Sequence, residues 1–593
     1  MSGRDRQGSQ VRAEAVGAVL VLAGGVVLYE RHLTWVLVLA GILAVLLGLA
    51  RWSVFPGRKL PKNRVRYMRV RLWLRLHPGR GQATVFQLWL RWSRWAALRG
   101  SSRTCRSLSF GQRIRAGSAA YSVLVGVTHY CHRLRVSLEE HILVMAPPRS
   151  GKTGWLARII LRRRGPVVST TTKHDVFELT SGLRARRGPV HVFNPQGIGG
   201  VPSTFRWNPL DGCQDPAVAI RRADGFAYAV SMDGVEGGGF WSDKASDYLR
   251  ACFQAAALGG MDLRQVATWI LAEDATEAEE ILWDSGRDQW AASLRELRGD
   301  AQKTAATVRM TMSRALAFLG DPALLDAVLP AEDCGLSIEE FLRSNGTLYM
   351  IAESSNERAP LAALYACLAG EIHYQAALLG SRMPGGRLDP PLLMALDEVT
   401  QICPVPLPGW LADSGGKGIQ IVPVVHGEAQ LASRWKDHGK RIIEDTCGVK
   451  VWLPGISDPQ TLEMASRLCG TAAFREHGQE HLSRHPVMTE DMIRQLPAGH
   501  ALVVRGGLYP VVARLPMAWK DRAYKQARRA GAAVAAVTAA PAAVIEDSRT
   551  ARRAAVPAGN ARALPRWPAP VPGASPDGNP FATPAARNGG GHG

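Results

Sequence analysis

The hydrophobic and polar positions divide the chain into segments of four kinds. Two apolar stretches, 13–29 and 33–50, are each about as long as a membrane-spanning helix. Short apolar runs that are typical of buried strands occur at 141–145, 346–352, 392–396 and 419–425. Apolar residues recur at helical spacing at 242–258, 261–271, 275–285 and 303–319. After about residue 527, large aliphatic residues become rare. The pattern predicts a membrane hairpin, an α/β core with an inserted all-α domain, and a disordered tail.

The two long stretches predict a tight N-terminal transmembrane hairpin, because only Glu30, Arg31 and His32 separate them. Three arginines precede the pair, and six basic residues follow it between 51 and 66. By the positive-inside rule, both termini face the cytoplasm, and the chain is a two-span protein of the plasma membrane. The competing interpretations are a signal peptide and a buried hairpin of a soluble protein. No small-residue cleavage site separates the stretches, which disfavours the signal peptide.

Positive charge is concentrated directly after the hairpin. The net charge is +21, and residues 51–140 contain nineteen Lys or Arg against two acids. Such a block requires a polyanion, and its position favours anionic membrane lipids over nucleic-acid phosphate. Within it, Trp89, Trp92 and Trp95 recur every third residue in the segment 83–98. This spacing predicts one aromatic face on a helix, either at the membrane interface or buried in a soluble core.

Neither the cysteines nor the ratio of arginine to lysine indicates a specific chemical site. The nine cysteines are odd in number and none stands at CxxC spacing, so we expect neither a metal site nor a disulfide framework. Sixty arginines against twelve lysines indicate a GC-rich bacterial genome.

The most specific motif is a phosphate-binding loop. The strand predicted at 141–145 leads into the sequence APPRSGKT at 146–153, and a helix is predicted to follow. This strand–loop–helix context is the one a Walker A motif requires, so ATP is the expected ligand. The predicted phosphate-binding residues are Pro148, Arg149, Ser150, Gly151, Lys152, Thr153 and Gly154. Lys152 reaches the β- and γ-phosphates and Thr153 supplies a hydroxyl to Mg²⁺. Ala146 departs from the pattern, which usually has glycine first.

A Walker B motif and a sensor are predicted on two further strands. The apolar run 392–396 ends in Asp397, predicted to hold the Mg²⁺ shell, and Glu398, predicted to orient and activate water. The run 419–425 ends at His426, and Gln430 lies one helical turn later. Either polar side chain is a candidate sensor of the γ-phosphate. The alternative is that both are ordinary polar residues on the surface.

With these motifs, the sequence resembles the type IV secretion coupling proteins, the TraG-like conjugative transfer ATPases, of actinobacterial type. The resemblance covers most of residues 1–520. It rests on the hairpin, the two nucleotide motifs and, in family order, VVSTTTKHD at 167–175, VFNPQ at 192–196, RWNPL at 206–210, the segments 418–431 and 444–470, LPAG at 496–499 and the strand 501–505. His426 departs from the family, which commonly has glutamine there.

The resemblance implies a RecA-like P-loop core at 136–214 and 346–520. An all-α domain at 215–345 is inserted in that core. The hairpin (1–50) and a basic juxtamembrane region (51–135) precede it, and a disordered Ala/Pro/Arg-rich tail (527–593) follows. The implied protein is a homo-hexameric motor. It couples ATP hydrolysis to moving single-stranded DNA, a relaxase–DNA complex or another secreted substrate protein into a type IV secretion channel.

Several roles stay open at the level of sequence. A membrane receptor that recruits substrates with little hydrolysis is compatible with Ala146 and His426. An FtsK-like pump for double-stranded DNA usually has more membrane spans and a terminal winged-helix domain. An arginine that reaches across a subunit interface is expected of a ring motor, with Arg434 and Arg441 as candidates. The acidic segment 273–280 is predicted to be a solvated surface or a docking surface for a basic relaxase.

Overall fold

The computed structural model describes residues 81–529, except 231–237, 300–301, 330–334, 354–360 and 476–481. The predicted hairpin and most of the predicted tail lie outside the described residues. Among the helices that are described, none is long and apolar enough to cross a membrane.

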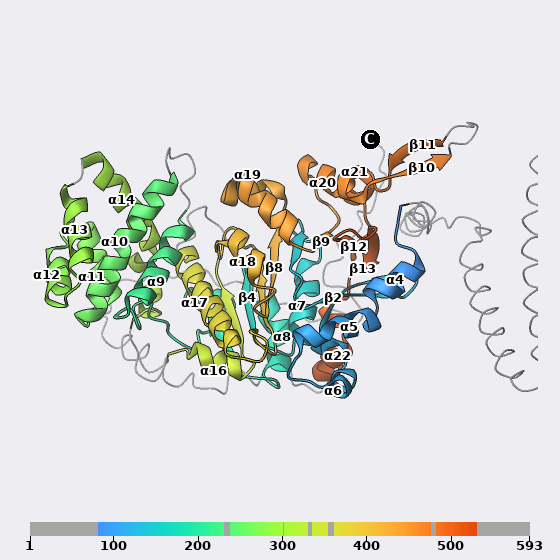
Figure 1. The fold of residues 1–593 in the computed structure, drawn as a ribbon, viewed down its shortest axis with the longest axis horizontal. Coiled ribbons are helices and arrows are strands. Elements are labelled where there is room, and N and C mark those ends of the chain that lie inside the picture. Colours follow the sequence, from blue (N-terminus) through green and yellow to red (C-terminus); the bar gives the residue numbers. More distant parts are fainter. Residues whose placement is uncertain are drawn as a thin grey trace, which may run out of the picture.

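A large mixed sheet runs through the middle of the molecule (Figure 1). It is built from eleven strands: β1 (Ser122–Thr128), β2 (Arg133–Ser137), β3 (Ile142–Met145), β4 (Val167–Thr171), β5 (Val190–Phe193), β6 (Thr347–Ile351), β7 (Leu392–Leu396), β8 (Ile419–Val425), β9 (Val449–Trp452), β12 (His500–Arg505) and β13 (Val511–Arg514). Their order is β2-β1-β13-β12-β9-β3-β8-β7-β4-β6-β5. Neighbours from β9 to β5 are parallel, and neighbours from β2 to β9 are antiparallel. A separate hairpin joins β10 (Thr471–Arg475) and β11 (Leu482–Pro486).

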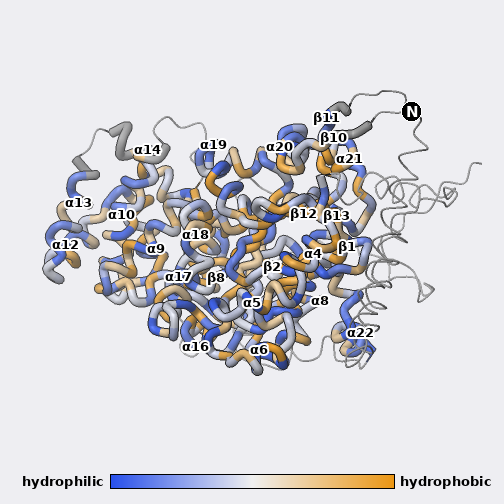
Figure 2. Tube along the Cα trace, turned by 45° about the vertical axis from the view of Figure 1, so that its right-hand side comes forward, coloured by the Kyte–Doolittle hydropathy of each residue, from blue (hydrophilic) through white to orange (hydrophobic). Residues whose placement is uncertain are grey.

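The parallel half of the sheet explains the continuous apolar runs in the sequence. Every residue of β3, β4, β6, β7 and β8 is buried. Strands that are covered on both faces carry mostly apolar side chains, and the buried polar residues Ser169, Thr170 and Gln420 are exceptions. Along β3, Leu143 and Met145 pack into one hydrophobic core, whereas Ile142 and Val144 pack into the core on the other face. The chain is therefore hydrophobic along the central strands and hydrophilic along α22 (Arg522–Arg529) (Figure 2).

Helices cover both faces of the sheet. Those that follow or join its strands are α7 (Lys152–Arg162), α8 (Asp175–Arg184), α17 (Ala362–Ser381), α18 (Leu407–Asp413), α19 (Glu428–Thr446), α20 (Pro459–Cys469) and α21 (Glu490–Arg494). Short 3₁₀ helices lie at η1 (Ser118–Ala120), η2 (Ile198–Gly200), η3 (Ala317–Gly320) and η4 (Ala518–Lys520).

Between β5 and β6 the described chain forms a helical layer at one end of the molecule, on the left of Figure 1. Its helices are α9 (Pro216–Ala229), α10 (Gly238–Leu258), α11 (Leu263–Leu271), α12 (Thr276–Asp284), α13 (Asp288–Gly299), α14 (Gln302–Ala315) and α15 (Pro322–Asp326), followed by α16 (Ile338–Arg343) beside the sheet. The carboxylates of Asp215, Asp262 and Asp321 accept from backbone amides and cap α9, α11 and α15.

The predicted tryptophan face is wrong, because the helix breaks within it. Ser93 is extended (φ −70°, ψ 169°) and ends α4 (Val85–Trp92), and its hydroxyl caps α5 (Arg94–Thr104), which α6 (Phe110–Ala116) follows. Trp92 is 1% exposed and packs in the core, whereas Trp89 and Trp95 are 50% and 57% exposed. The three rings therefore do not share one surface.

Several strands of the sheet, among them β1 and β2, lie where no strand is predicted from the sequence. β1 and β2 form an antiparallel hairpin that pairs with β13 at the sheet edge. In β2 the arginines alternate with buried Leu134 and Val136. The high local charge obscured this period-two pattern in the sequence.

A buried arginine links α8 to the sheet. Arg184 is 0% exposed and donates to the carbonyl oxygens of Arg163, Gly165 and Asn345 at 2.5, 3.0 and 3.2 Å. It also donates to the Thr347 hydroxyl at 2.7 Å. Burial lowers its pKa to about 10, so the guanidinium stays charged at neutral pH. The backbone before β4 and before β6 is thus held by one side chain.

Replacing Arg184 with alanine is expected to lower the free energy of unfolding by about 3 kcal/mol, because it leaves buried carbonyl oxygens without donors. The urea midpoint of the full chain measures this change. Arg186→Ala, at an exposed neighbouring position, is the control and is expected to change the midpoint little. Equal midpoints for the two variants would contradict the role of Arg184.

His141, just before β3, makes the fold sensitive to acid. It is 4% exposed, its Nδ1 accepts from the Ile421 amide at 3.0 Å, and burial lowers its pKa to about 4. The unfolded chain binds this proton below about pH 6.5. Stability is therefore fully present above about pH 6.5 and falls as the pH drops towards 4. In His141→Asn, whose amide oxygen accepts but does not titrate, a smaller loss of urea midpoint between pH 7 and 4.5 is expected. An identical pH dependence would refute this account.

Candidate functional site

Three adjacent parallel strands bring the predicted motifs to one edge of the sheet. β8 lies between β3 and β7, with Met145 opposite Val425 and Leu396 opposite Pro423. The residues that follow these strands are Ala146, His426 and Asp397. Because carboxyl ends of parallel strands meet at the same edge, the loop, the sensor candidates and the acidic pair converge there.

The loop at 146–153 ends in an uncapped helix. Gly151 precedes α7 with φ 91°, a left-handed conformation that glycine adopts without strain, and no side chain caps the helix. The first amides of α7 therefore have no intrahelical acceptor and are available to an anion. Pro148 and Arg149 are exposed at the loop, and Arg149 is also left-handed (φ 61°). Thr153 is the second residue of α7.

Residues from the end of the described chain support this helix. The Met517 methyl lies 3.3 Å from where a Cβ on Gly151 would be, and the Trp519 ring lies 2.2 Å from a Cβ built on Gly154. A side chain at Gly154 would therefore displace the tryptophan ring. Trp155 is fully buried and its indole donates to the Val125 carbonyl at 2.8 Å. Sequence reasoning missed Met517 and Trp519, since contacts so distant in the chain leave no local signal.

Lys152 faces the two predicted Walker B carboxylates. Its Nζ lies 3.1 Å from Asp397 Oδ1 and forms an ion pair and hydrogen bond with Glu398 Oε1. Both carboxylates are buried, at 3% and 6% exposed. Burial alone lowers the pKa of Lys152, but the two carboxylates outweigh it and raise that pKa above its usual value. Burial raises the pKa of Asp397, against the effect of Lys152. The lysine therefore compensates an acidic pair that is costly to bury.

Several buried polar atoms at the site have spare bonding capacity. Ser150 Oγ and Glu398 Oε2 have no hydrogen-bond partner among the described residues, and Asp397 Oδ1 has none there besides its ion pair with Lys152. The Thr170 hydroxyl donates to the Asp397 carbonyl at 2.8 Å and fixes the backbone behind the carboxylate. Carboxylate and hydroxyl oxygens beside free amides and an ammonium are a donor set that fits Mg²⁺ and a polyphosphate.

Of the two sensor candidates, His426 lies nearer the acidic pair. Its Nε2 is 3.3 Å from Glu398 Oε1, and its Nδ1 lies 3.0 Å from the Ala146 carbonyl, to which it donates in the matching tautomer. Gln430 instead accepts from the His426 amide at 2.8 Å through its side-chain oxygen. The imidazole thus bridges the phosphate loop and Glu398, and Gln430 holds the backbone of His426.

The two arginine candidates differ in their surroundings. The Arg434 guanidinium lies over the Tyr228 ring at 5.4 Å and donates to the Tyr228 carbonyl. Arg441 lies further along α19 and is exposed.

Comparison with known proteins gives matches of three kinds: to a family, to a curated relative and to solved structures. A family described as "TraM recognition site of TraD and TraG" matches residues 391–498, which include Asp397 and His426. The conjugal transfer protein TraG of Escherichia coli is 25% identical over 446 residues, which is 65% of this chain and 68% of that protein.

The third match is to solved structures of one conjugative coupling protein. Unbound TrwB superposes with a TM-score of 0.51 at 17% identity, over 70% of this chain and 94% of TrwB. TrwB with a non-hydrolysable ATP analogue gives 0.50 at 17% identity, over 69% and 92% of the two chains. The α/β fold with its large mixed sheet is therefore that of TrwB. Together with the family match and the alignment to TraG, it confirms the resemblance of this chain to the type IV secretion coupling proteins.

Proposed function

We propose that the chain is a membrane-anchored ATPase that couples ATP hydrolysis to conjugative transfer of DNA, or of a relaxase–DNA complex, through a type IV secretion channel. The observation that carries the proposal is the contact of Lys152 with Asp397 and Glu398 at the end of the phosphate loop. The match to TraG and the fold of TrwB, a conjugative coupling protein that has been solved with nucleotides, support the biological setting.

In this proposal each residue has one role. Lys152 leaves the carboxylates and binds the β- and γ-phosphates, while the amides from Ser150 to Gly154 hold the phosphate oxygens. Thr153 and Asp397 hold Mg²⁺, which neutralises phosphate charge when bound. Glu398 accepts a proton from the attacking water. His426, poised against Glu398, reports the state of the γ-phosphate to the backbone that Gln430 holds.

The assembly and the membrane anchor are part of the proposal. A homo-hexameric ring would place single-stranded DNA along a shared axis, with Arg434 or Arg441 reaching a neighbouring site. The predicted hairpin would anchor the ring in the plasma membrane with both termini in the cytoplasm. The basic segment 51–80 would then contact anionic lipids, and the secretion channel would lie beyond it.

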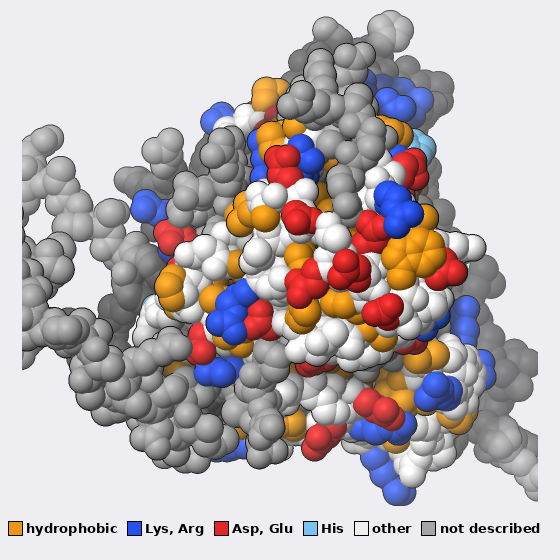
Figure 3. All heavy atoms as spheres, turned by 90° about the vertical axis from the view of Figure 1, so that its left-hand side faces the viewer, with side chains coloured by type: hydrophobic (Ala, Val, Ile, Leu, Met, Phe, Trp, Pro, Cys, Tyr) orange, Lys and Arg blue, Asp and Glu red, His pale blue; other side chains and the backbone are white. Residues whose placement is uncertain are grey.

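The helical end of the molecule is the proposed receiving surface for substrate protein. Figure 3 faces this end, where acidic side chains gather over α11 to α13. The exposed acids there include Glu273, Glu280 and Asp284, next to the exposed apolar side chains of Leu271 and Trp283. Not all of the acidic segment is free, because Glu277 accepts from the Trp269 indole at 2.9 Å and buried Glu279 pairs with Arg295. A mixed acidic and apolar surface suits a basic protein partner.

ATP turnover by the full chain in detergent, with and without single-stranded DNA, tests the proposed motor. Turnover is expected to rise with DNA. Lys152→Ala is expected to lower it about 100-fold or more, because it removes the phosphate counter-charge. Glu398→Gln is expected to lower it similarly while ATP binds as tightly or more tightly, since glutamine no longer holds Lys152.

The alternatives give different results in the same assay. ATP binding without turnover under any DNA condition would contradict the motor and favour a receptor that recruits substrates. Stimulation by double-stranded but not single-stranded DNA would favour a duplex pump. Normal turnover in Lys152→Ala would overturn the assignment of the site.

Charge reversal tests the receiving surface. Glu280→Lys with Asp284→Lys is expected to lower the frequency of conjugative transfer about tenfold, because like charges repel a basic substrate, while ATP turnover stays at the wild-type level. Glu178→Lys with Glu339→Lys, which reverses two exposed acids on α8 and α16, is the matched control. Transfer that is equal in the variant and the control would rule out this surface.

A further inference from the structure

A cavity of about 500 Å³ lies behind the phosphate loop, between α7 and the three-stranded edge of the sheet. Its lining is basic and contains no Asp or Glu. The cations that line it come from both sides: Arg133, Arg135, Arg158, Arg162, Arg163, Arg514 and Lys520, of which Arg163 is bonded to the Pro391 and Leu392 carbonyls and to Gln420. None of the residues of the loop at 146–153, and neither Asp397 nor Glu398, lines it, so it is separate from the nucleotide site.

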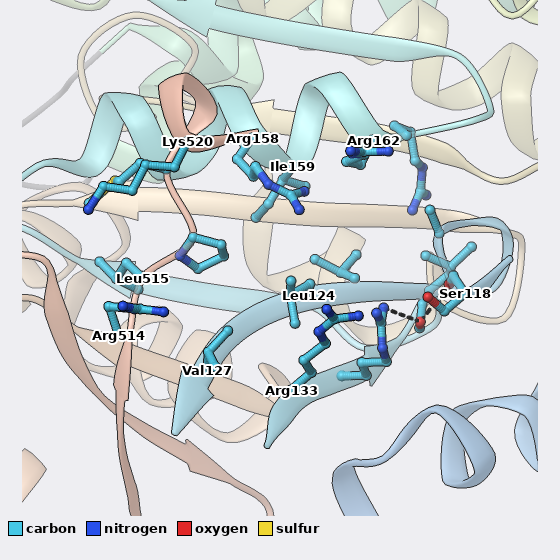
Figure 4. Close-up of a pocket in the computed structure, with 18 residues that line it drawn as sticks. Ser118, Leu124, Val127, Arg133, Arg158, Ile159, Arg162, Arg514, Leu515 and Lys520 are labelled. Atoms are coloured by element: carbon cyan, nitrogen blue, oxygen red, sulfur yellow. Dashed lines mark hydrogen bonds between the residues drawn. The ribbon is translucent and has the colours of Figure 1, made fainter. Parts of the chain in front are cut away.

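The register of the sheet explains why the arginines converge. Arg133 on β2 and Arg514 on β13 both lie opposite Val127 on β1. Residues directly opposite each other in an antiparallel sheet project from the same face. Arg135, two residues after Arg133, shares that face. Figure 4 shows Arg133 and Arg514 below the cavity and Arg158, Arg162 and Lys520 above it.

More cations line the cavity than there are carboxylates that pair with them. Within the described part of the chain, Asp521 forms ion pairs with Arg158 at 2.9 Å and Arg162 at 2.6 Å. No ion pair with an acid is recorded there for Arg133, Arg135, Arg514 or Lys520. Arg135 is only 9% exposed, and its one hydrogen bond, to the Ser122 hydroxyl, is long at 3.4 Å.

Mutual repulsion adds to burial in lowering the pKa values of two of these arginines. Burial first, and Arg133 second, lower the pKa of Arg135 to about 10. Arg133 also contributes to a lowered pKa at Arg158, after burial. Like charges enclosed together cost free energy unless an anion compensates them.

The apolar residues that line the cavity restrict the kind of anion that fits it. Leu124, Ile159, Leu515 and Met517 give the cavity an apolar wall, and the volume exceeds that of a phosphate group alone. The matching ligand carries two or more phosphate charges and an apolar portion.

We propose that this cavity binds an organic phosphate with at least two negative charges, either an anionic lipid headgroup or a soluble phosphate ester. Such a ligand is distinct from the nucleotide of the phosphate loop. It contacts α7 and the segment 515–520, whose Met517 and Trp519 support Gly151 and Gly154 of the loop.

Binding to the full chain in lipid-free detergent tests the proposal. The Lys152→Ala background prevents a signal from the phosphate loop, so the result does not depend on the proposed function. Two probes are titrated: pyrophosphate alone, and mixed micelles that contain cardiolipin, a lipid with two phosphates. The variant combines Arg133→Gln with Arg514→Gln, two exposed positions whose replacement leaves the hydrophobic core unchanged. Arg186→Gln with Arg382→Gln removes the same charge elsewhere on the exposed surface.

At least one probe is expected to bind, with affinity lowered about tenfold or more in the Arg133/Arg514 variant and unchanged in the control. Pyrophosphate binding identifies a soluble phosphate ester, whereas binding of cardiolipin micelles alone identifies a lipid headgroup. Absence of binding by either probe, or equal loss in variant and control, would overturn the proposal. The proposal would also be overturned if the Arg133/Arg514 variant lost affinity only for a DNA oligonucleotide and for neither probe. The arginines would then belong to a nucleic-acid track.

Discussion

Two carboxylates that follow one another at the end of a buried strand, Asp397 and Glu398, impose the main constraint on this structure. Burial, and then the neighbouring charge of Glu398, raise the pKa of Asp397, and a cation must lie within reach to hold the buried charge. Lys152 supplies it, but only because β3 and β7 run parallel on either side of β8 and end at one edge. The order of the central strands is therefore tied to the chemistry of the site. Any ligand that draws Lys152 away must bring its own means of compensating the acidic pair, and a divalent cation with polyphosphate does so.

The helix that carries Lys152 is held from behind by chain segments that are remote in sequence. The Trp155 indole is hydrogen-bonded to β1. The segment after β13 packs Met517 against Gly151 and Trp519 against Gly154 at the start of the helix. The same helix presents Arg158 and Arg162 to the arginine-lined cavity. One element therefore borders both the phosphate loop and a second basic surface. Besides extending the sheet, the edge strands β1, β2 and β13 form the other side of that cavity.

Local patterns predicted the strands at the centre of the fold and singled out acidic and basic residues that the structure brings into contact there. β3, β7 and β8 are continuous apolar runs because both faces of a parallel strand are covered, and the polar residues after them are the ones that meet. The local patterns did not reveal β1 and β2. In β2 two arginines take the alternate positions and mask its apolar residues, whereas β1 (Ser122–Thr128) contains no charged residue and was not recognised. It misassigned Trp92, because the break at Ser93 depends on a cap that spacing alone does not reveal. The supporting roles of Met517 and Trp519 depend on tertiary contacts and left no motif.

The most direct test of the central claim is a structure of the full chain with Mg²⁺ and a non-hydrolysable ATP analogue. The account predicts that Lys152 Nζ leaves Glu398 for the phosphates, that Thr153 and Asp397 hold the metal shell, and that Glu398 faces the γ-phosphate. An analogue bound elsewhere, with Lys152 still paired to both carboxylates, would contradict it.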